Sequence, residues 1–550
     1  MPTTVRLFRC VPMLAASLAA PAIYAATPAP GGSFTQSCKN IEVVGDALYA
    51  SCKTLQDGWQ KTSLPALNLC LNSITSNGDI ANIDGNLVCM PDLPKVRGPA
   101  SFPVSETKLN DWIYGSQNAE LYRHSWDIWA GLNQVVGKVN NVPVRAFETW
   151  ATPFLMLYQT NGGKTLQANA APAKAPAVKT LPSLELQLPH QFVNIRPKLK
   201  AAANGASPVG DTNILVSVAY NPPAAQHAVN NKLFLQQTLD QYLKNGYTEV
   251  PNFPSNAITI KPVYKHISAK VFSNKLYVMP GWPGTPSPAR AFDQSEWGSC
   301  VYVNIKGTGA GGNSIDTGCK GANAGNTFYL NNFIHHKLNA AEAAALNKRQ
   351  PDAQASAGDY AILVGMHVTT REIKRWTWQT YWWSANADQP YSPSSAEIAA
   401  FRKQTPLDPA ANHYAMAVAY QMVQPAQPIT GGKNVGSSLI AYNPYLESGF
   451  DPSVFDYCAS VGGDGTDAIP SKANCDKPNP NINRFGVQTN CMTCHHMAMY
   501  NPKTNYKDSA NRERPYATDF YMSLQDPAFN GSLKLDFAWS LLGYMQDSDK

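Results

Sequence analysis

The chain has 550 residues, of which 15% are charged, and its formal net charge is +6. This length exceeds the roughly 250 to 300 residues over which a single core usually grows, so more than one domain is expected. The nearly neutral charge, without a basic run interleaved with aromatic residues, gives no support to nucleic-acid binding, and 42 prolines with 37 glycines are typical of a loop-rich exported protein.

The first 25 residues have the features of a secretory signal peptide. Arg6 and Arg9 form a positive end, residues 11–20 form a short apolar segment, and cleavage is expected after Ala25. The apolar segment is too short to cross a bilayer, and no later segment has about eighteen uninterrupted apolar residues. We therefore expect a periplasmic or secreted protein whose mature form has no transmembrane segment.

Eight of the cysteines that follow the signal segment fall into local pairs. Even numbers of locally spaced cysteines in an exported chain indicate disulfides. Each bridge would close a loop of about 15 to 20 residues and stabilise the fold by about 3 kcal/mol in the loop-entropy account. Spacing does not prove the pairing, so free thiols remain the alternative. The expected pairs are Cys38 with Cys52, Cys70 with Cys89, Cys300 with Cys319, and Cys458 with Cys475.

Residues 33–90 are predicted to form a small β-rich module that disulfides stabilise. The polar/apolar alternation of residues 41–48 predicts a half-buried strand, and Asp84 with Gly85 predicts a hairpin turn. The run Phe34-Thr35-Gln36-Ser37-Cys38 and the closing residues 80–87 resemble the opening and the close of a cyanovirin-N homology repeat.

That resemblance implies a lectin-like module with a disulfide between Cys38 and Cys52, and it makes a glycan a candidate partner. Asn68, Asn82 and Asp84 could hydrogen-bond a sugar, whereas Asn and Asp in turns usually bond to their own backbone.

A proline-rich linker is predicted at residues 91–104, followed by a large region of mixed helix and strand, residues 105–550. The overall prediction is an α+β multidomain fold. Apolar spacing predicts helices within residues 110–136 and 232–247, and a capping box of Asn339 with Glu342 predicts another. Strands are predicted at residues 257–264, 275–279, 301–305, 360–370, 414–423 and 438–442.

His367 lies near the end of a predicted strand that leads into an aromatic-rich segment. This histidine could be a second axial ligand, a distal catalytic base, or a hydrogen-bonded core residue. The aromatic side chains could line a haem or aromatic-substrate pocket, or they could simply be core. They are Trp376, Trp378, Tyr381, Trp382 and Trp383.

The run Cys491-Met492-Thr493-Cys494-His495 has the C-x-x-C-H spacing at which c-type haem is attached. Two thiols at this spacing can reach the two vinyl groups of a porphyrin, and His495 would then be the proximal iron ligand. An accidental match is expected only about 0.004 times in a chain with these cysteines. The chemical alternatives are a redox disulfide and half of a zinc site.

Residues 105–550 resemble large exported bacterial proteins with one C-x-x-C-H near the C-terminus, and the cytochrome c-like part spans about residues 480–550. The resemblance rests on His124-Ser125-Trp126, the run from His367 to Ile373, and the run from Asn490 to His495, and it implies one covalent haem c. A filled sixth iron position indicates electron transfer, and an open one indicates ligand or peroxide chemistry. Candidates for that position are Met522, Met545, His335, His336 and His367.

Three functions are therefore compared. The first is an electron-transfer haemoprotein with a redox partner protein or small molecule, in which the N-terminal module is accessory. The second is a haem-dependent peroxidase or oxygenase that acts on an aromatic or polymer-derived substrate, with His367 as its distal group. The third is a glycan-binding protein whose haem is structural.

Overall fold

The computed structural model describes residues 28–74, 78–94, 102–160, 186, 214–268, 276–349, 353–450, 485–502 and 519–543. The expected signal peptide, Cys458, Cys475, Met545 and the middle of the expected linker lie outside these ranges. The fold mixes helices with several β-sheets, as predicted. Among the described helices, none is both long enough and apolar enough to cross a membrane.

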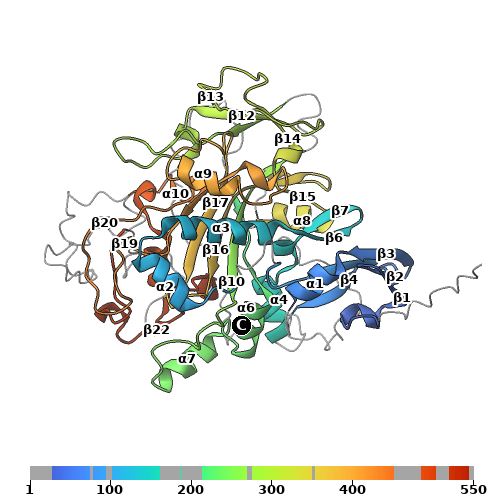
Figure 1. Ribbon diagram of the computed structural model, residues 1–550, viewed down its shortest axis with the longest axis horizontal. Helices are drawn as coiled ribbons and strands as arrows, with labels where there is room; N and C mark the ends of the chain where they lie inside the picture. The colour runs from blue at the N-terminus through green and yellow to red at the C-terminus, as the bar shows by residue number, and fades with distance from the viewer. Residues whose placement is uncertain are drawn as a thin grey trace, which may run out of the picture.

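A seven-stranded sheet forms the centre of the large region (Figure 1). Two neighbouring strands of this sheet, Tyr360–Thr370 and Thr377–Trp383, are almost wholly buried, because mostly apolar and aromatic residues occupy both of their faces. All the strand pairs in this sheet are antiparallel. The strands are β8 (Leu215–Val216), β9 (Ala219–Tyr220), β10 (Ile258–Ile267), β15 (His335–Lys337), β16 (Tyr360–Thr370), β17 (Thr377–Trp383) and β18 (Tyr414–Val418).

Different helices cover the two faces of this sheet. Helix α3 (Asn118–Asn133) crosses one face, where Trp129 stacks on Tyr381 of β17 with ring centroids 4.3 Å apart. Successive side chains of a strand point to opposite faces. Trp378 of β17 therefore points to the other face, where it packs against helix α11 (Cys491–His496).

The predicted helices exist, with bounds set by local signals. The helical stretch expected within residues 110–136 is two helices, α2 (Glu106–Tyr114) and α3, because Ser116 between them adopts the left-handed conformation. Asn339 and Glu342 form the predicted capping box at α8 (Ala340–Arg349). The other α-helices within the described ranges are α1 (Leu67–Ser73), α4 (Pro153–Thr160), α6 (Pro222–Asn230), α7 (Gln236–Lys244), α9 (Ala396–Arg402), α10 (Pro444–Glu447) and α12 (Ser540–Gly543).

The N-terminal module is β-rich. Asp84 and Gly85 both have positive φ and turn the hairpin, as predicted. One sheet contains β1 (Cys38–Val44), β2 (Ala47–Lys53) and β3 (Trp59–Pro65), and a second contains β4 (Asp79–Ile83), β5 (Asn86–Met90), β6 (Val135–Val139) and β7 (Val142–Arg145). The second sheet combines strands from both sides of the expected linker, because β6 and β7 come from the large region. Val136 and Val144 of these two strands complete the hydrophobic core of the module.

A smaller sheet lies at the top of Figure 1 and contains β11 (Tyr277–Pro280), β12 (Ser299–Asn304), β13 (Asp316–Thr317) and β14 (Thr327–Tyr329). Two short pairs, β19 (Val423–Gln424) with β20 (Ser437–Ser438) and β21 (Met499–Tyr500) with β22 (Leu533–Lys534), flank the central sheet. The structure contains disulfides, as the sequence predicts, and they join Cys38 to Cys52, Cys70 to Cys89, and Cys300 to Cys319.

Candidate functional site

The C-x-x-C-H run forms the short helix α11, which begins at a well-defined cap. The Asn490 side chain accepts a hydrogen bond from the Thr493 amide at 3.0 Å and donates to the carbonyls of Gln421 and Leu439. A three-residue separation places Cys491 and Cys494 on the same side of a helix. Neither cysteine forms a disulfide, and both residues are partly exposed. The Cys491 thiol donates a hydrogen bond to the Ala441 carbonyl at 3.3 Å. The motif thus presents two adjacent free thiols from one helical turn.

The ring of His495 is held on two sides. Its Nδ1 lies 3.0 Å from the carbonyl oxygen of Phe537, and its ring centroid lies 4.2 Å from that of Trp378. Because a carbonyl can only accept, Nδ1 carries the proton and Nε2 keeps its lone pair. Burial lowers the pKa of His495 to about 3, so the imidazole is neutral at physiological pH.

Three ionisable side chains from other elements lie beside this helix. Lys261 of β10 and His367 of β16 are directly opposite each other in the sheet, on the same face as Trp378. His367 Nε2 lies 2.9 Å from a carboxylate oxygen of Glu447, at the end of α10. The structure therefore brings His367 next to the motif, although 124 residues of chain separate it from Cys491.

The electrostatics of the thiols distinguish between the chemical alternatives. Burial, reinforced by the charge of Glu447, raises the pKa of Cys494 to about 12, and burial also raises the pKa of Cys491. A redox-active dithiol needs a lowered thiol pKa instead. Within the ranges that the structure describes, no group of three or more His, Cys, Asp or Glu side chains is arranged to hold a metal ion.

The other candidates for the sixth iron position are placed differently. Met522 is buried, and its neighbour Ser523 accepts a hydrogen bond from His496 at 3.0 Å, so Met522 lies near α11. His335 and His336 pair with residues of β16 that are five and six positions from His367, which is roughly 16 to 20 Å along the strand. The structure does not bring those two histidines to the thiols.

Most of the predicted aromatic cluster is core. Trp383 stacks on Phe333 with ring centroids 4.5 Å apart, Tyr381 packs on α3, and both are buried. Trp378 is the member of the cluster that contacts His495. Within the described part of the chain, Trp378 is therefore the one residue of the predicted aromatic cluster with a ring contact to His495.

Sequence reasoning missed Lys261, Glu447 and the Phe537 carbonyl. A signal existed for Lys261, because a lysine inside an apolar strand is unusual unless a partner compensates its charge. Burial lowers the pKa of Lys261 to about 8, against the opposing effect of Glu447. No local signal marks Glu447 or Phe537, since both reach the site by long-range packing.

Two of the three sugar-binding candidates of the N-terminal module, Asn82 and Asp84, use their side chains to bind their own module, whereas Asn68 is exposed and its backbone amide donates to Asp46. Asn82 donates to the Ser37 hydroxyl and to the Lys53 carbonyl, and it accepts from the Gly85 amide. Asp84 accepts from the Leu55 amide at 3.0 Å. These contacts give both residues a structural role in the turns.

The two family resemblances rest on the short motifs quoted for them. Comparison of this chain with models of protein families, with curated proteins and with solved structures finds no match.

Proposed function

We propose that this protein is an exported c-type haemoprotein that transfers electrons. One haem would be attached through the thiols of Cys491 and Cys494, with His495 Nε2 as the proximal ligand of its iron. The observation that carries the proposal is the hydrogen bond from His495 Nδ1 to the Phe537 carbonyl, beside two cysteines that form no disulfide and lie on one helical turn.

The residues present fit this group. Iron-binding histidines usually donate their second ring N–H to a carbonyl or carboxylate, which fixes the tautomer and increases the basicity of the ligand nitrogen. His495 has that arrangement, and it is neutral, as a ligand must be. Burial raises the pKa of both thiols, so they are protonated at physiological pH and available for thioether formation.

Each side chain has a task in this proposal. When bound, the haem supplies one-electron chemistry, and the protein supplies its binding, orientation and electrostatics. Trp378 packs against one side of the His495 ring and would help to hold its orientation. Lys261 and Glu447 place opposite charges near the thiols, and these charges are expected to tune the reduction potential.

A haem-dependent oxidoreductase is the second candidate, and the His367–Glu447 pair favours it. A histidine hydrogen-bonded to a carboxylate can hold or release a proton near a reacting ligand. In the structure His367 Nε2 is hydrogen-bonded to the Glu447 carboxylate. This arrangement suits a distal acid or base better than an iron ligand bound through that nitrogen.

A glycan remains a candidate partner of the accessory module, now through a different surface. Tyr49 and Trp59 are 45% and 51% exposed on the outer face of the β1–β3 sheet. Lys39 lies over the Trp59 ring, 3.8 Å from its centroid. Exposed aromatic rings with polar neighbours suit stacking on sugar rings. The disulfides of the chain are compatible with a periplasmic or extracellular location.

The test is expression of the full chain with a c-type maturation system, followed by haem staining of a denaturing gel. The parent is expected to keep its haem, whereas Cys491→Ala and Cys494→Ala each lose one thioether and reduce the staining. The double variant Cys300→Ala with Cys319→Ala removes a disulfide away from α11 and is expected to stain like the parent. A parent without covalent haem would overturn the proposal.

Carbon monoxide then separates the two candidate functions. A reduced spectrum that carbon monoxide leaves unchanged indicates a filled sixth position and an electron carrier. A spectrum that changes indicates an open position and favours the enzyme.

A further inference from the structure

The loop that binds His495 has an unusual backbone. Asp536 and Phe537 are consecutive non-glycine residues with φ values of 47° and 67°. Residues other than glycine rarely adopt this region, because their Cβ atom is sterically strained there. Surrounding contacts must therefore hold the turn, and the turn is what aims the Phe537 carbonyl at His495 Nδ1.

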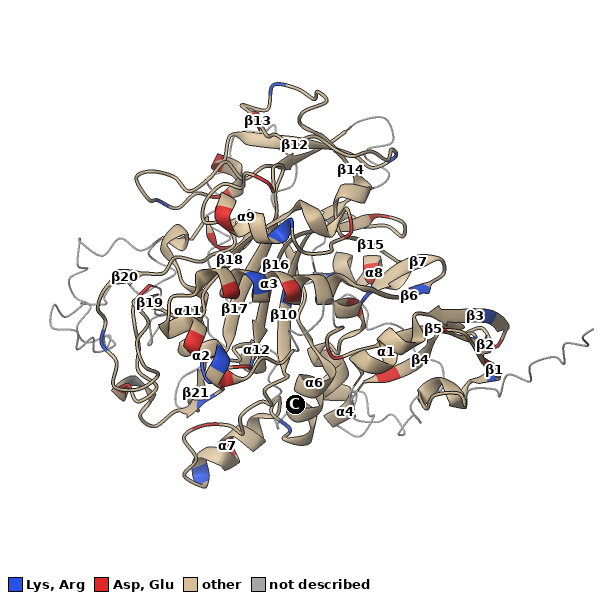
Figure 2. Ribbon diagram, viewed as in Figure 1, with Lys and Arg blue, Asp and Glu red and all other residues tan. Residues whose placement is uncertain are grey.

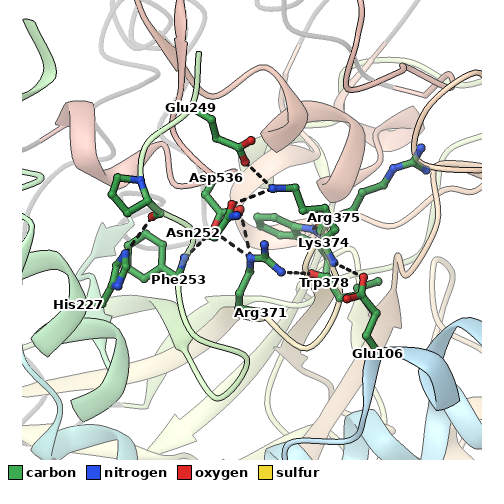
Figure 3. Close-up of polar contacts among 12 residues, drawn as sticks. Glu106, His227, Glu249, Asn252, Phe253, Arg371, Lys374, Arg375, Trp378 and Asp536 are labelled. Atoms are coloured by element: carbon green, nitrogen blue, oxygen red, sulfur yellow. Dashed lines mark hydrogen bonds and ion pairs between the residues drawn. The ribbon is translucent and has the colours of Figure 1, made fainter. Parts of the chain in front are cut away.

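The Asp536 side chain supplies those contacts. It is buried, and its carboxylate accepts hydrogen bonds from Arg371 Nε at 2.9 and 3.2 Å and from the Phe253 amide at 2.9 Å (Figure 3). Arg371 also donates to the Ile373 carbonyl at 3.1 Å. The carboxylate is thus fixed from two elements that are far from it in the sequence.

The same segment that provides Arg371 also leads to Trp378. Arg371 begins the turn between β16 and β17, and Trp378 donates its indole N–H to the Arg375 carbonyl at the end of that turn. Both supports of the His495 ring, the Phe537 carbonyl and the Trp378 face, are therefore attached to residues 371–378. Figure 3 shows the hydrogen bonds that join Arg371 to Asp536, with Trp378 nearby.

A purely structural role explains this arrangement less well. Burying a charge pair carries a desolvation penalty, and well-packed apolar residues often replace buried pairs without loss of stability. The Asp536–Arg371 pair here joins the strained turn to the β16–β17 connection. These two segments support the His495 ring, so a shift of either segment would move that ring.

We propose that Asp536, fixed by Arg371, is a positioning residue for His495: it holds the turn whose carbonyl fixes the imidazole tautomer and so leaves Nε2 as the nitrogen that would bind the haem iron. The inference rests on the proposed haem attachment. The charged pair acts through the Phe537 backbone and does not itself contact the ligand.

The first test compares Asp536→Asn with the parent in the matured full chain. The variant is expected to keep its covalent haem, since the thioethers do not depend on the turn. Its reduction potential is expected to shift to more positive values and its iron–histidine vibration to lower frequency, because the imidazole becomes a weaker donor. A folded variant with the parental potential and vibration would overturn the inference.

Two further variants separate positioning from general damage. Arg371→Lys keeps the positive charge but loses the forked donor geometry, and a smaller shift in the same direction is expected. Glu249→Gln removes the partner of Lys374, 2.7 Å away in the same charged cluster, and is expected to leave both readouts at parental values. Equal shifts in Glu249→Gln and Asp536→Asn would contradict a specific role.

A haem-independent readout keeps this inference distinct from the proposed function. The full chain, with its ten histidines labelled with ¹⁵N and made without haem maturation, is examined by NMR, with His495→Gln identifying the signal. The parent is expected to hold the Nδ1–H tautomer, and Asp536→Asn is expected to exchange between tautomers. If the parent binds no haem but shows this difference, only the proposed function fails. An unchanged tautomer overturns the positioning role.

Discussion

At the scale of single residues, the two adjacent histidines of α11 show what a motif can and cannot predict. His495 and His496 both bind backbone carbonyls, of Phe537 and Ser523. The C-x-x-C-H spacing selects His495 as the proposed ligand without any structure, because haem attachment at this spacing fixes the position of the histidine. The sequence cannot predict which carbonyl fixes each ring, since the two acceptors are 42 and 27 residues away along the chain.

The sequence leaves three possible roles open for His367, and the geometry of the structure bears on the choice between them. Its ion pair with Glu447 gives it a partner, and its place on the sheet face puts it beside the motif. Proximity of this kind depends on strand register, which pairs His367 with Thr380 and Lys261. Register is a long-range property that periodicity does not contain.

His413 allows a test of the electrostatics away from the candidate site. Burial and the charge of Arg402 lower its pKa to about 4, while Asp388 opposes the shift. The unfolded state therefore binds more protons between pH 6.5 and 4, so stability falls as the pH falls through that window. The loss from this residue is about 2 to 3 kcal/mol.

The variant His413→Gln is expected to lose that part of the acid sensitivity. The measurement is the urea midpoint, followed by tryptophan fluorescence, of both proteins at pH 7.5 and pH 4.5. The midpoint of the parent should fall further between these values than that of the variant. Parallel shifts would mean that His413 is not held neutral in the fold.

At the scale of elements, the predictions that succeeded depend on local chemistry. The Asp84 and Gly85 turn needs two residues that tolerate positive φ, and the capping box at α8 needs Asn339 and Glu342 three residues apart. The strand predicted at residues 438–442 was mostly wrong, because only Ser437–Ser438 pairs, in β20. Further along this segment, Ala441 instead forms an isolated parallel β-bridge with Asn490.

Gly486 couples two short elements of the site and gives a prediction at this scale. A Cβ on this residue would lie 1.7 Å from the Glu447 carbonyl oxygen, so α10 or the segment before α11 would have to move. Gly486→Ala is expected to destabilise the protein by about 1 to 3 kcal/mol. Gly31→Ala is the control, because nothing lies within 4 Å of a Cβ there. Equal denaturation midpoints for the two variants would contradict the predicted clash.

At the scale of the whole molecule, composition and motifs indicate the mixed fold but not how its parts join. Charged side chains of both signs are interspersed along the described ribbon in Figure 2, in keeping with the near-neutral balance of the chain. The proline-rich stretch at residues 91–104 reads locally as a linker. The β5–β6 pairing nevertheless continues one sheet past it, through Val88 and Gly137, which no local pattern could have predicted.

This joining of the parts predicts that the N-terminal module depends on the large region for its stability. Val144 of β7 is 3% exposed within the module's core, whereas Val142 on the same strand is 51% exposed. Val144→Ala removes buried methyl groups and is expected to cost about 1 to 3 kcal/mol. The loss should appear as weaker amide hydrogen-exchange protection in β1 to β5, although the substitution lies outside residues 33–90. Val142→Ala, the matched control, should leave that protection at the parental level. Unchanged protection of β1 to β5 in Val144→Ala would instead mean that the module is stable by itself and that β6 and β7 only rest against it.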